Sequence, residues 1–474
     1  MKAYKSFTLM LALLMLASCG DAAPAGETTA ESTTAEVVEI SPFDALPDKD
    51  FGGYEFRIFM RNDQSFLRDM QAESETGDLM NDTIYARNRK VEERFNIKMS
   101  ILLAKDGQGA DAAKHIMADD DVFDIYMPYG RTALTDAQQE IMVEWNGDTM
   151  PDVDLDAPWW DQSARDTFSV GHHVYYMTGD ISFVSFGMMN AVFFNKDIFD
   201  EYGVKYPYQL AIDGKWTFDE FAKIAKTCQA DLNGDSQMTF GEDLVGYVTS
   251  EWSGPVRVLY SGGSTIYAKD GDDIPYLAIN TERTVDIFEK FFALAADPGV
   301  IIETSGKYKT SGTKAFKAGT AAMFEAAVRV AESYRDMDGE FGILPCPKFD
   351  ETDDKYYCLG GALFICVPIT NPDTARTGLI LEAMAIESHE TVLPTYFDVV
   401  LERKVTRDEE SAEMVRLIHD GRMFDMGFID NNGSMKDVGQ RLSNQAEPNF
   451  ASFYAANVTS CETALQKTID AYLN

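Results

Sequence analysis

Positive charge is scarce in this sequence. Lys and Arg number 41 against 78 Asp and Glu in 474 residues, a formal net charge of −37. Nucleic-acid binding needs clustered Lys and Arg, so the shortage argues against a nucleic-acid partner. It also argues against strongly anionic ligands unless a local basic patch exists. Most of the acidic side chains are expected to lie on a solvated surface.

Zinc-site and catalytic motifs are also missing. The sequence has no Gly-x-Ser-x-Gly elbow, His-Glu-x-x-His zinc motif, Lys-bearing phosphate loop or nucleotide-binding Gly-rich turn. No two of the five cysteines after Cys19 have metal-site spacing; they are Cys228, Cys346, Cys358, Cys366 and Cys461. Cys346 and Cys358 could pair across a turn in an exported chain, or remain buried thiols.

The apolar runs are short. Phe7–Leu16 follows two lysines and has the length of a signal-peptide core rather than of a membrane span. It ends in Leu16-Ala17-Ser18-Cys19, which resembles the lipobox of bacterial lipoproteins. The resemblance implies that residues 1–19 are a lipoprotein signal peptide and that Cys19 receives a diacylglycerol. The alternative is an ordinary secretory signal with a chance cysteine.

Residues 20–43 are rich in Ala, Thr, Ser and Glu and show no apolar period. This composition predicts a disordered tether. The full sequence is 45% hydrophobic and long enough for two or three domains, so a large core is expected. With the lipid on Cys19, the protein is expected at the extracellular face of the cell membrane.

Alternating apolar and helical patterns predict an α/β fold. Strands are expected at Phe51–Met60, Ile97–Leu103 and Val122–Met127, separated by helices at Asp82–Phe95 and Ala110–Ala118. The order strand, helix, strand, helix, strand indicates a parallel sheet.

A second α/β part begins near the middle of the chain. Met188–Phe194 is an apolar run that predicts a buried strand, and Asp197–Tyr202 a short helix after it. We expect this strand to carry the chain from one lobe to another. Thr217 and Glu220 form a capping box that opens a helix over Gly214–Ala230.

The segment that follows has the spacing of an EF-hand calcium loop. Oxygen-bearing side chains occupy positions one, three, five, seven, nine and twelve: Asp231, Asn233, Asp235, Gln237, Thr239 and Glu242. Ser236 stands at the sixth position, where glycine normally permits the sharp turn. The alternatives are a structural Ca²⁺ that clamps the loop and an Asn-Gly-Asp turn with a solvated acidic rim.

Several motifs, taken in order, resemble a known family. They are the lipobox, Phe194-Asn-Lys-Asp, Trp216-Thr-Phe-Asp-Glu, Phe316-x-x-Gly-x-Ala-Ala-Met and Gly342-x-x-Pro-x-Pro. The resemblance is to family 1 extracellular solute-binding proteins, the capture subunits of bacterial carbohydrate ABC importers, of which the maltose-binding protein is the best known. It implies an α/β, two-lobe periplasmic-binding-protein-like fold (type II) with a multi-segment hinge.

The resemblance also implies a division of the chain. Residues 44–187 plus 319–366 are expected to form lobe 1, and residues 188–318 plus 367–474 lobe 2. In this division the Phe316 motif returns the chain to the first lobe, and Gly360–Pro368 crosses back a third time.

Solute contacts are expected at strand ends, at the crossings and on exposed aromatic side chains. The two tryptophans after Pro158 include one that could line a cleft, the alternative being a pair split between the core and a lobe contact. The predicted ligand-binding residues are Arg61, Tyr129, Arg131, Trp159, Trp160, Asp180, Trp252, Tyr267, Glu325 and Arg329, of which the family resemblance implies Trp252, Glu325 and Arg329.

The resulting hypothesis is a lipid-anchored monomer that captures a small solute, most simply an oligosaccharide, and delivers it to ABC permease subunits without a required cofactor. A cell-surface glycosidase using paired carboxylates is the alternative. An adhesin or sensor ectodomain is less consistent with the ordered motifs.

Overall fold

The computed structural model describes residues 41–105, 111–304, 306–334, 337–397, 409–430 and 434–473. Pro42–Asn474 form one compact unit. The signal peptide, the lipidation of Cys19 and the tether up to residue 40 lie outside the described residues. The compact unit begins with α1 (Pro42–Ala45), which buries Phe43, so the tether predicted for residues 20–43 extends slightly too far.

The first lobe is built on a five-stranded sheet of order β2-β1-β3-β13-β4. Its strands are β1 (Tyr54–Met60), β2 (Ile97–Leu103), β3 (Ile125–Met127), β4 (Tyr176–Met177) and β13 (Ile365–Cys366). β1 pairs in parallel with β2 and β3, which confirms the predicted parallel sheet. The helix predicted between the first two strands is α3 (Leu79–Phe95), and its apolar stripe of Ile84, Val91 and Phe95 is buried.

The second lobe is built on another five-stranded sheet, of order β11-β5-β10-β6-β9. Its strands are β5 (Asn190–Asn195), β6 (Val245–Ser250), β9 (Val300–Glu303), β10 (Ala321–Ala327) and β11 (Phe341–Leu344). All six residues of β5 are buried, as its apolar sequence predicts. β5 runs antiparallel to β10 and β11, whereas β10 is parallel to β6.

The observed sheets differ from the predicted division of the chain. β10 and β11 flank β5 in the second sheet, whereas residues 319–366 were expected in the first lobe. The reason is that β5 is buried over its whole length and lies inside its sheet, so a strand must pair with it on each side. β10 passes directly into the 3₁₀ helix η2 (Val328–Tyr334).

The chain crosses between the sheets as predicted at the first crossing. It leaves β4, passes through α7 (Phe183–Gly187) and enters β5. Ser182 begins α7 by accepting a hydrogen bond from the Ser185 backbone N–H, and its hydroxyl also contacts buried Asp69. The chain returns to the first sheet between β12 (Cys358–Leu359) and β13. α14 (Thr374–Glu387) then packs against α3 in the first lobe, although residues 367–474 were expected in the second.

The remaining elements cover the sheets. The helices are α2 (Gln64–Leu67), α4 (Asp111–Met117), α5 (Gly130–Ala137), η1 (Gly147–Thr149), α6 (Gln162–Phe168), α8 (Lys196–Glu201), α9 (Tyr208–Ile212), α10 (Phe218–Thr227), α11 (Gly254–Ser261), α12 (Glu282–Ala295), α13 (Gly312–Lys317), η3 (Ser388–Val392), α15 (Leu393–Thr395), α16 (Glu409–Asp420), α17 (Met426–Ile429), η5 (Ser434–Asp437), α18 (Val438–Ser443) and α19 (Phe450–Leu473). Two short pairs complete the fold, β7 (Tyr267–Lys269) with β8 (Pro275–Leu277) and β12 with β14 (Arg422–Met423). The predicted cap Thr217 accepts from the Glu220 N–H at the start of α10.

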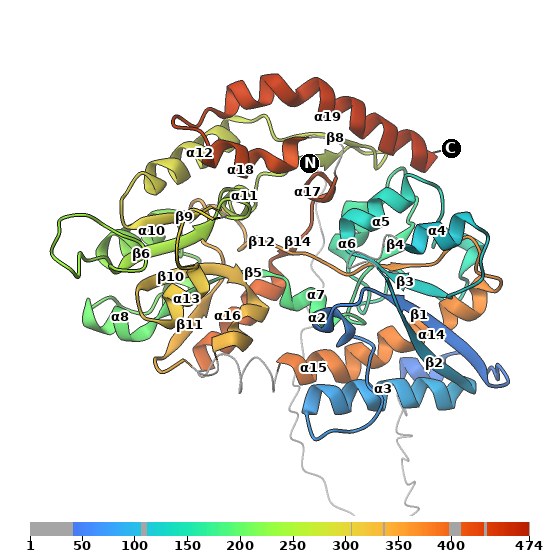
Figure 1. Cartoon of the computed structure of the whole chain (residues 1–474). Coiled ribbons are helices and arrows are strands. Elements are labelled where there is room, and N and C mark those ends of the chain that lie inside the picture. The colour runs from blue at the N-terminus through green and yellow to red at the C-terminus, as the bar shows by residue number, and fades with distance from the viewer. Residues whose placement is uncertain are drawn as a thin grey trace, which may run out of the picture. The chain divides into compact units, whose positions relative to one another are not determined.

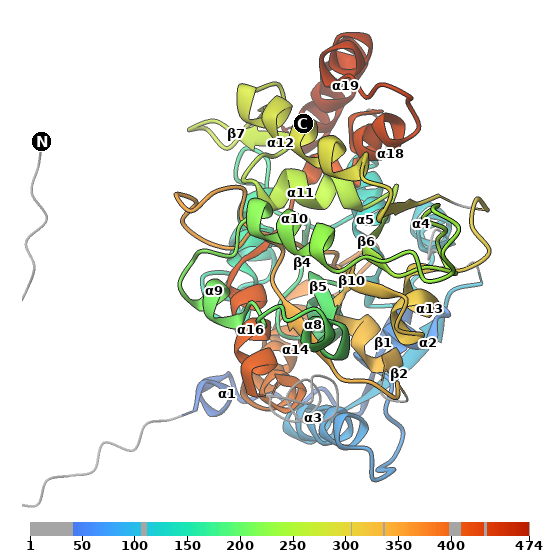
Figure 2. The same cartoon turned by 90° about the vertical axis from the view of Figure 1, so that its left-hand side faces the viewer.

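The long helix α19 connects the two lobes. Its first residue, Phe450, packs near Phe288 of α12, with ring centroids 5.4 Å apart. Near its other end, the Tyr472 hydroxyl donates to that of Tyr176 in β4 at 3.3 Å. Figures 1 and 2 show α18 and α19 at one end of the folded unit and α3 at the opposite end. The larger of two buried apolar clusters includes residues of both sheets, and the other joins the first sheet to α11, α12 and α19, so the lobes share packing near the hinge.

Candidate functional site

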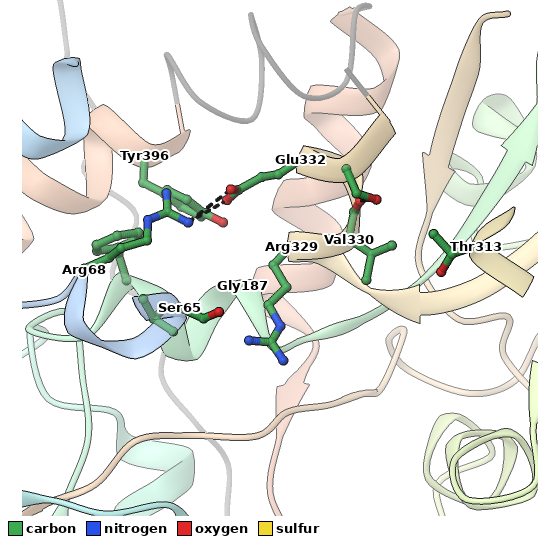
Figure 3. A pocket seen from close by; sticks show the side chains of 11 residues that line it. Ser65, Arg68, Gly187, Thr313, Arg329, Val330, Glu332 and Tyr396 are labelled. Atoms are coloured by element: carbon green, nitrogen blue, oxygen red, sulfur yellow. Dashed lines mark hydrogen bonds and ion pairs between the residues drawn. The ribbon is translucent and has the colours of Figure 1, made fainter. Parts of the chain in front are cut away.

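The carboxyl ends of β1 and β10, one strand from each sheet, meet at a pocket (Figure 3). The pocket has a volume of about 360 Å³. Its lining comes from the segment after β1, from α7, from α13 and η2, and from the segment after α15: Ser65, Arg68, Phe183, Val184, Gly187, Thr313, Arg329, Val330, Glu332, Ser333 and Tyr396. Ligands of open α/β sheets bind beyond the carboxyl ends of strands, so this position is that of a ligand site.

An ion pair joins the lobes across this pocket. Nη1 of Arg68, just after α2, donates to both carboxylate oxygens of Glu332 in η2, at 3.0 and 3.1 Å. Figure 3 shows the pair spanning the space between the two segments. Both side chains are partly exposed, so solvent screens the attraction and the pair contributes little to stability. Its geometric importance is that a change in lobe spacing must alter it.

Two more arginines lie on one aromatic ring beside the pocket. The Arg61 guanidinium carbon is 4.5 Å from the centre of the Phe66 ring, and that of Arg329 is 5.7 Å away. Arg61 follows β1, as predicted, and Arg329 follows β10, so the ring brings together residues of both lobes. Gly187 leaves room for this arrangement, since a Cβ there would lie 3.4 Å from the Arg329 Cβ and 3.1 Å from the Tyr396 hydroxyl.

Tyr129 also belongs to this group. It directly follows the buried end of β3, and its backbone bridges to Leu363 of the returning segment. Burial raises the pKa of the Tyr129 hydroxyl, and the positive charges of Arg131, Arg329 and Arg61 oppose that rise. The structure therefore brings together four of the predicted ligand-binding residues, Arg61, Tyr129, Arg131 and Arg329.

The two adjacent tryptophans are organised by a single carboxylate. The indole N–H groups of Trp159 and Trp160 donate to the two oxygens of Glu382 in α14, at 2.9 and 2.8 Å. Trp160 is only 1% exposed and packs edge-on against Trp145, with ring centroids 5.4 Å apart. Trp160 is thus a core residue rather than a solute contact, while Trp159 is partly exposed beside His389. The pair is therefore split between the core and a partly exposed position, as one half of the sequence alternative expected, while a contact of Trp159 with the other lobe stays a prediction.

Two other predicted residues are held by internal contacts. Asp180 is buried and its Oδ2 lies 2.6 Å from Nδ1 of His389, whose pKa this hydrogen bond raises. Tyr267 is buried, and its hydroxyl donates to Asp430 at 3.0 Å. These two side chains therefore have structural partners inside the folded unit, which differs from the predicted solute contact.

Glu325 is buried in β10. It accepts hydrogen bonds from the Tyr247 hydroxyl and, at 3.1 Å, from Thr249. Nε of Arg257 lies 3.8 Å from its other oxygen. Burial raises the pKa of Glu325, and the Arg257 charge and the two hydrogen bonds oppose that rise. The carboxylate thus fixes the interior of the second lobe next to the site rather than facing solvent.

Trp252 is the most exposed aromatic side chain among the predicted ligand-binding residues. It stands in the turn between β6 and α11, at the carboxyl end of β6, and is 58% exposed. An exposed indole at a strand end offers a flat apolar face for a ligand ring.

The predicted calcium loop has a compact turn structure. Asp231 accepts from the backbone N–H groups of Gly234 and Ser236, both at 2.7 Å. Ser236 adopts φ +64°, the left-handed conformation that glycine usually supplies at this position. Within the described residues, no group of three or more His, Cys, Asp or Glu is arranged to hold a metal ion. Calcium binding by Asp231, Asn233, Asp235, Gln237, Thr239 and Glu242 stays a prediction.

The sequence did not single out several residues that line the pocket. Arg68 follows the predicted strand end by only a few residues, and Glu332 lies one helical turn beyond Arg329, so spacing could have suggested both. Tyr396 and Thr313 carry no such local signal. The five cysteines after Cys19 are buried free thiols, which was one of the two alternatives.

Two α/β lobes joined by several chain passages, with a polar pocket between strand ends, define a two-lobe binding protein. Residues 80–377, more than half of the chain, match the family of bacterial extracellular solute-binding proteins. The chain belongs to this family, whose members are binding proteins rather than enzymes. No helix in the described part of the chain is long and apolar enough to cross a membrane.

Solved structures share the fold. UspC of M. tuberculosis is 16% identical, with a TM-score of 0.56 over 88% of this chain and 100% of that one. The sugar transporter RHE_PF00321 of Rhizobium etli, in an open conformation, is 15% identical, with a TM-score of 0.55 over 89% and 99%. The ABC substrate-binding protein Lmo0181 of Listeria monocytogenes, in complex with cycloalternan, is 15% identical, with a TM-score of 0.52 over 89% and 98%. No curated protein matches the sequence significantly.

Proposed function

We propose that this protein captures a saccharide between its two lobes and delivers it to the permease of an ABC importer. The observation that carries the proposal is the pocket where β1 and β10 end, lined by side chains of both lobes. A solute that contacts both lobes binds the closed state better than the open one, and this difference drives closure.

The chemistry of the site suits a sugar. Hydroxyl groups of Ser65, Thr313 and Ser333 line the pocket together with guanidinium and carboxylate groups, which pair well with sugar hydroxyls. Trp252 supplies an exposed indole face on which a sugar ring can stack. The sugar-binding proteins of similar fold support a saccharide, although their sequence identity is too low to identify which one.

Anchoring completes the proposal. The lipobox at Cys19 and the Ala, Thr, Ser and Glu-rich segment after it would hold the folded unit at the outer face of the membrane. A tethered monomer could present its closed form to the permease by diffusion within the reach of the tether.

Calorimetry with a panel of oligosaccharides tests the proposal on the chain from Ser41 onward, which contains the whole folded unit. We expect saturable binding of at least one saccharide and full recovery of that saccharide by chromatography after long incubation. Absence of binding across neutral and acidic saccharides would overturn the proposal. Appearance of shorter products would indicate a glycosidase instead.

A further inference from the structure

Positive charge gathers in the solute site of this acidic chain. Arg68 and Arg329 line the pocket, one from each lobe, and Arg61 and Arg131 follow the ends of β1 and β3. The chain as a whole has nearly twice as many acidic as basic side chains. A cluster of one sign against the sign of the whole molecule creates a local potential that selects ligands of opposite charge.

Two of these arginines have acidic partners. Arg68 pairs with Glu332 at 3.0 Å, and Nη2 of Arg61 lies 4.0 Å from Asp63. In the part of the chain that the structure describes, no carboxylate pairs with the guanidinium group of Arg131 or Arg329. The site therefore keeps a surplus of positive charge after its own carboxylates are counted.

The two unbalanced arginines come from different lobes. Arg131 lies in the first turn of α5, directly after β3, and Arg329 in η2, directly after β10. Both side chains are exposed. Figure 3 shows the Arg329 guanidinium turned away from the Arg68–Glu332 pair rather than toward it. An anionic group held by Arg131 and Arg329 would contact both lobes, which is the condition for ligand-driven closure.

Tyr129 supports the proximity of these groups. It stands two residues before Arg131, and the charges of Arg131 and Arg329 both act on its hydroxyl. The Phe66 ring independently brings Arg329 close to Arg61. Arginine at such a site is significant because its planar fork of N–H groups matches the two oxygens of a carboxylate.

We propose that the solute is an acidic saccharide, with a uronate-type carboxylate that pairs with Arg131 and Arg329. The inference rests on the proposed function and specifies its substrate class. The net charge of −37 repels an anion at long range, so recognition of an acidic sugar requires a local surplus of this kind. The neighbouring hydroxyls and aromatic faces remain available for the rest of the sugar.

Matched ligands test the proposal by calorimetry. Uronate oligomers, such as trigalacturonate and short mannuronate chains, are compared with their fully methyl-esterified forms and with neutral oligosaccharides of the same length. We expect a uronate oligomer to bind at least about 10-fold more tightly than its ester, because a charge-assisted hydrogen-bonded pair is lost. Its affinity is also expected to fall when NaCl rises from about 0.05 to 0.5 M.

Variants localise the effect. Arg131→Gln and Arg329→Gln are each expected to weaken uronate binding about 10- to 100-fold, and to weaken binding of the ester, which keeps only hydroxyl contacts, by a much smaller factor. Arg89→Gln is the control, since Arg89 is an exposed arginine of α3 that pairs with Glu92 of the same helix. It removes the same charge and is expected to leave uronate affinity unaltered.

The outcomes separate the two proposals. Neutral or esterified sugars that bind as tightly as the uronates, or variants that weaken both classes equally, would overturn the acidic saccharide and leave saccharide capture standing. Uronate binding that is equally weakened by Arg89→Gln would show a general charge effect and would also overturn the assignment. Failure of every saccharide to bind would overturn the proposed function itself.

Discussion

Glu382 gives the folded unit a defined dependence on pH. Its carboxylate is 2% exposed and receives the indole N–H groups of Trp159 and Trp160 at 2.9 and 2.8 Å. Burial raises its pKa from 4.5 to about 7, and the two indole hydrogen bonds oppose that rise. Because the folded state then binds a proton more tightly than the unfolded state, this group contributes stability below about pH 4.5 that is lost as the pH rises through 7.

The magnitude follows from the same values. A rise in pKa from 4.5 to about 7 corresponds to about 3 kcal/mol of unfolding free energy at 1.36 kcal/mol per pKa unit. Glu382→Gln removes the titration but leaves one indole N–H facing the amide NH₂, which lowers stability by about 1–3 kcal/mol. The unfolding free energy of the wild type, measured relative to that of this variant, is expected to fall by about 3 kcal/mol between pH 4.5 and 8.

Urea denaturation followed by tryptophan fluorescence, at several pH values between 4.5 and 8, measures this difference. Comparison with the variant isolates Glu382 from Asp69, Asp136 and Asp425, whose pKa values burial also raises to about 6. Glu413→Gln, at an exposed carboxylate of α16, serves as the control for the loss of one acidic side chain outside the core. A wild-type-minus-Glu382→Gln difference that is independent of pH would refute the assignment.

Three further predictions concern the site, the loop and the thiols. Trp252→Ala is expected to weaken saccharide binding about 10-fold in calorimetry, because the stacking face of the indole is lost. Tyr276→Ala, at an exposed aromatic residue of β8, is the control and is expected to leave the affinity unchanged. Equal effects of the two substitutions would exclude Trp252 as a specific stacking surface for the sugar. Calcium is expected to raise the melting temperature of the wild type but not that of a double variant, Asp231→Asn with Glu242→Gln. An identical response of both proteins would exclude this loop as the calcium site. The five thiols of the chain from Ser41 are expected to resist alkylation in the native protein, because they are buried and because the contact with Cys358 and burial raise the pKa of Cys346. All five are expected to react after denaturation without reductant, whereas only three reactive thiols would indicate a disulfide.

Patterns local in sequence predicted much of the fold. The alternation in Phe51–Met60 and the apolar stripe of α3 specified the first parallel strands, and the run before Asn195 specified the buried crossing strand. Thr217 as a helix cap was equally readable, because a capping hydrogen bond connects residues three apart.

The membership of strands in sheets was less predictable. The sequence of β10 shows an apolar strand, but only pairing with β5, more than 120 residues earlier in the chain, decides which sheet it joins. The tryptophan pair shows the same limit: its acceptor Glu382 lies 222 residues beyond Trp160, and no local pattern connects them. At the candidate site, Arg61, Tyr129 and Arg131 followed from the rule that ligands bind at strand ends, whereas the Arg68–Glu332 pair depends on contact between distant segments.

The central claim is that a solute closes the two lobes over the site between them. Spin labels on Leu103→Cys, at the end of β2, and Lys307→Cys, after the end of β9, would report the distance between exposed positions of the two lobes. With the native cysteines buried, pulsed electron paramagnetic resonance should show one distance distribution without solute and a shorter one at saturation. A distribution that stays unchanged while calorimetry shows the saccharide bound would contradict the account.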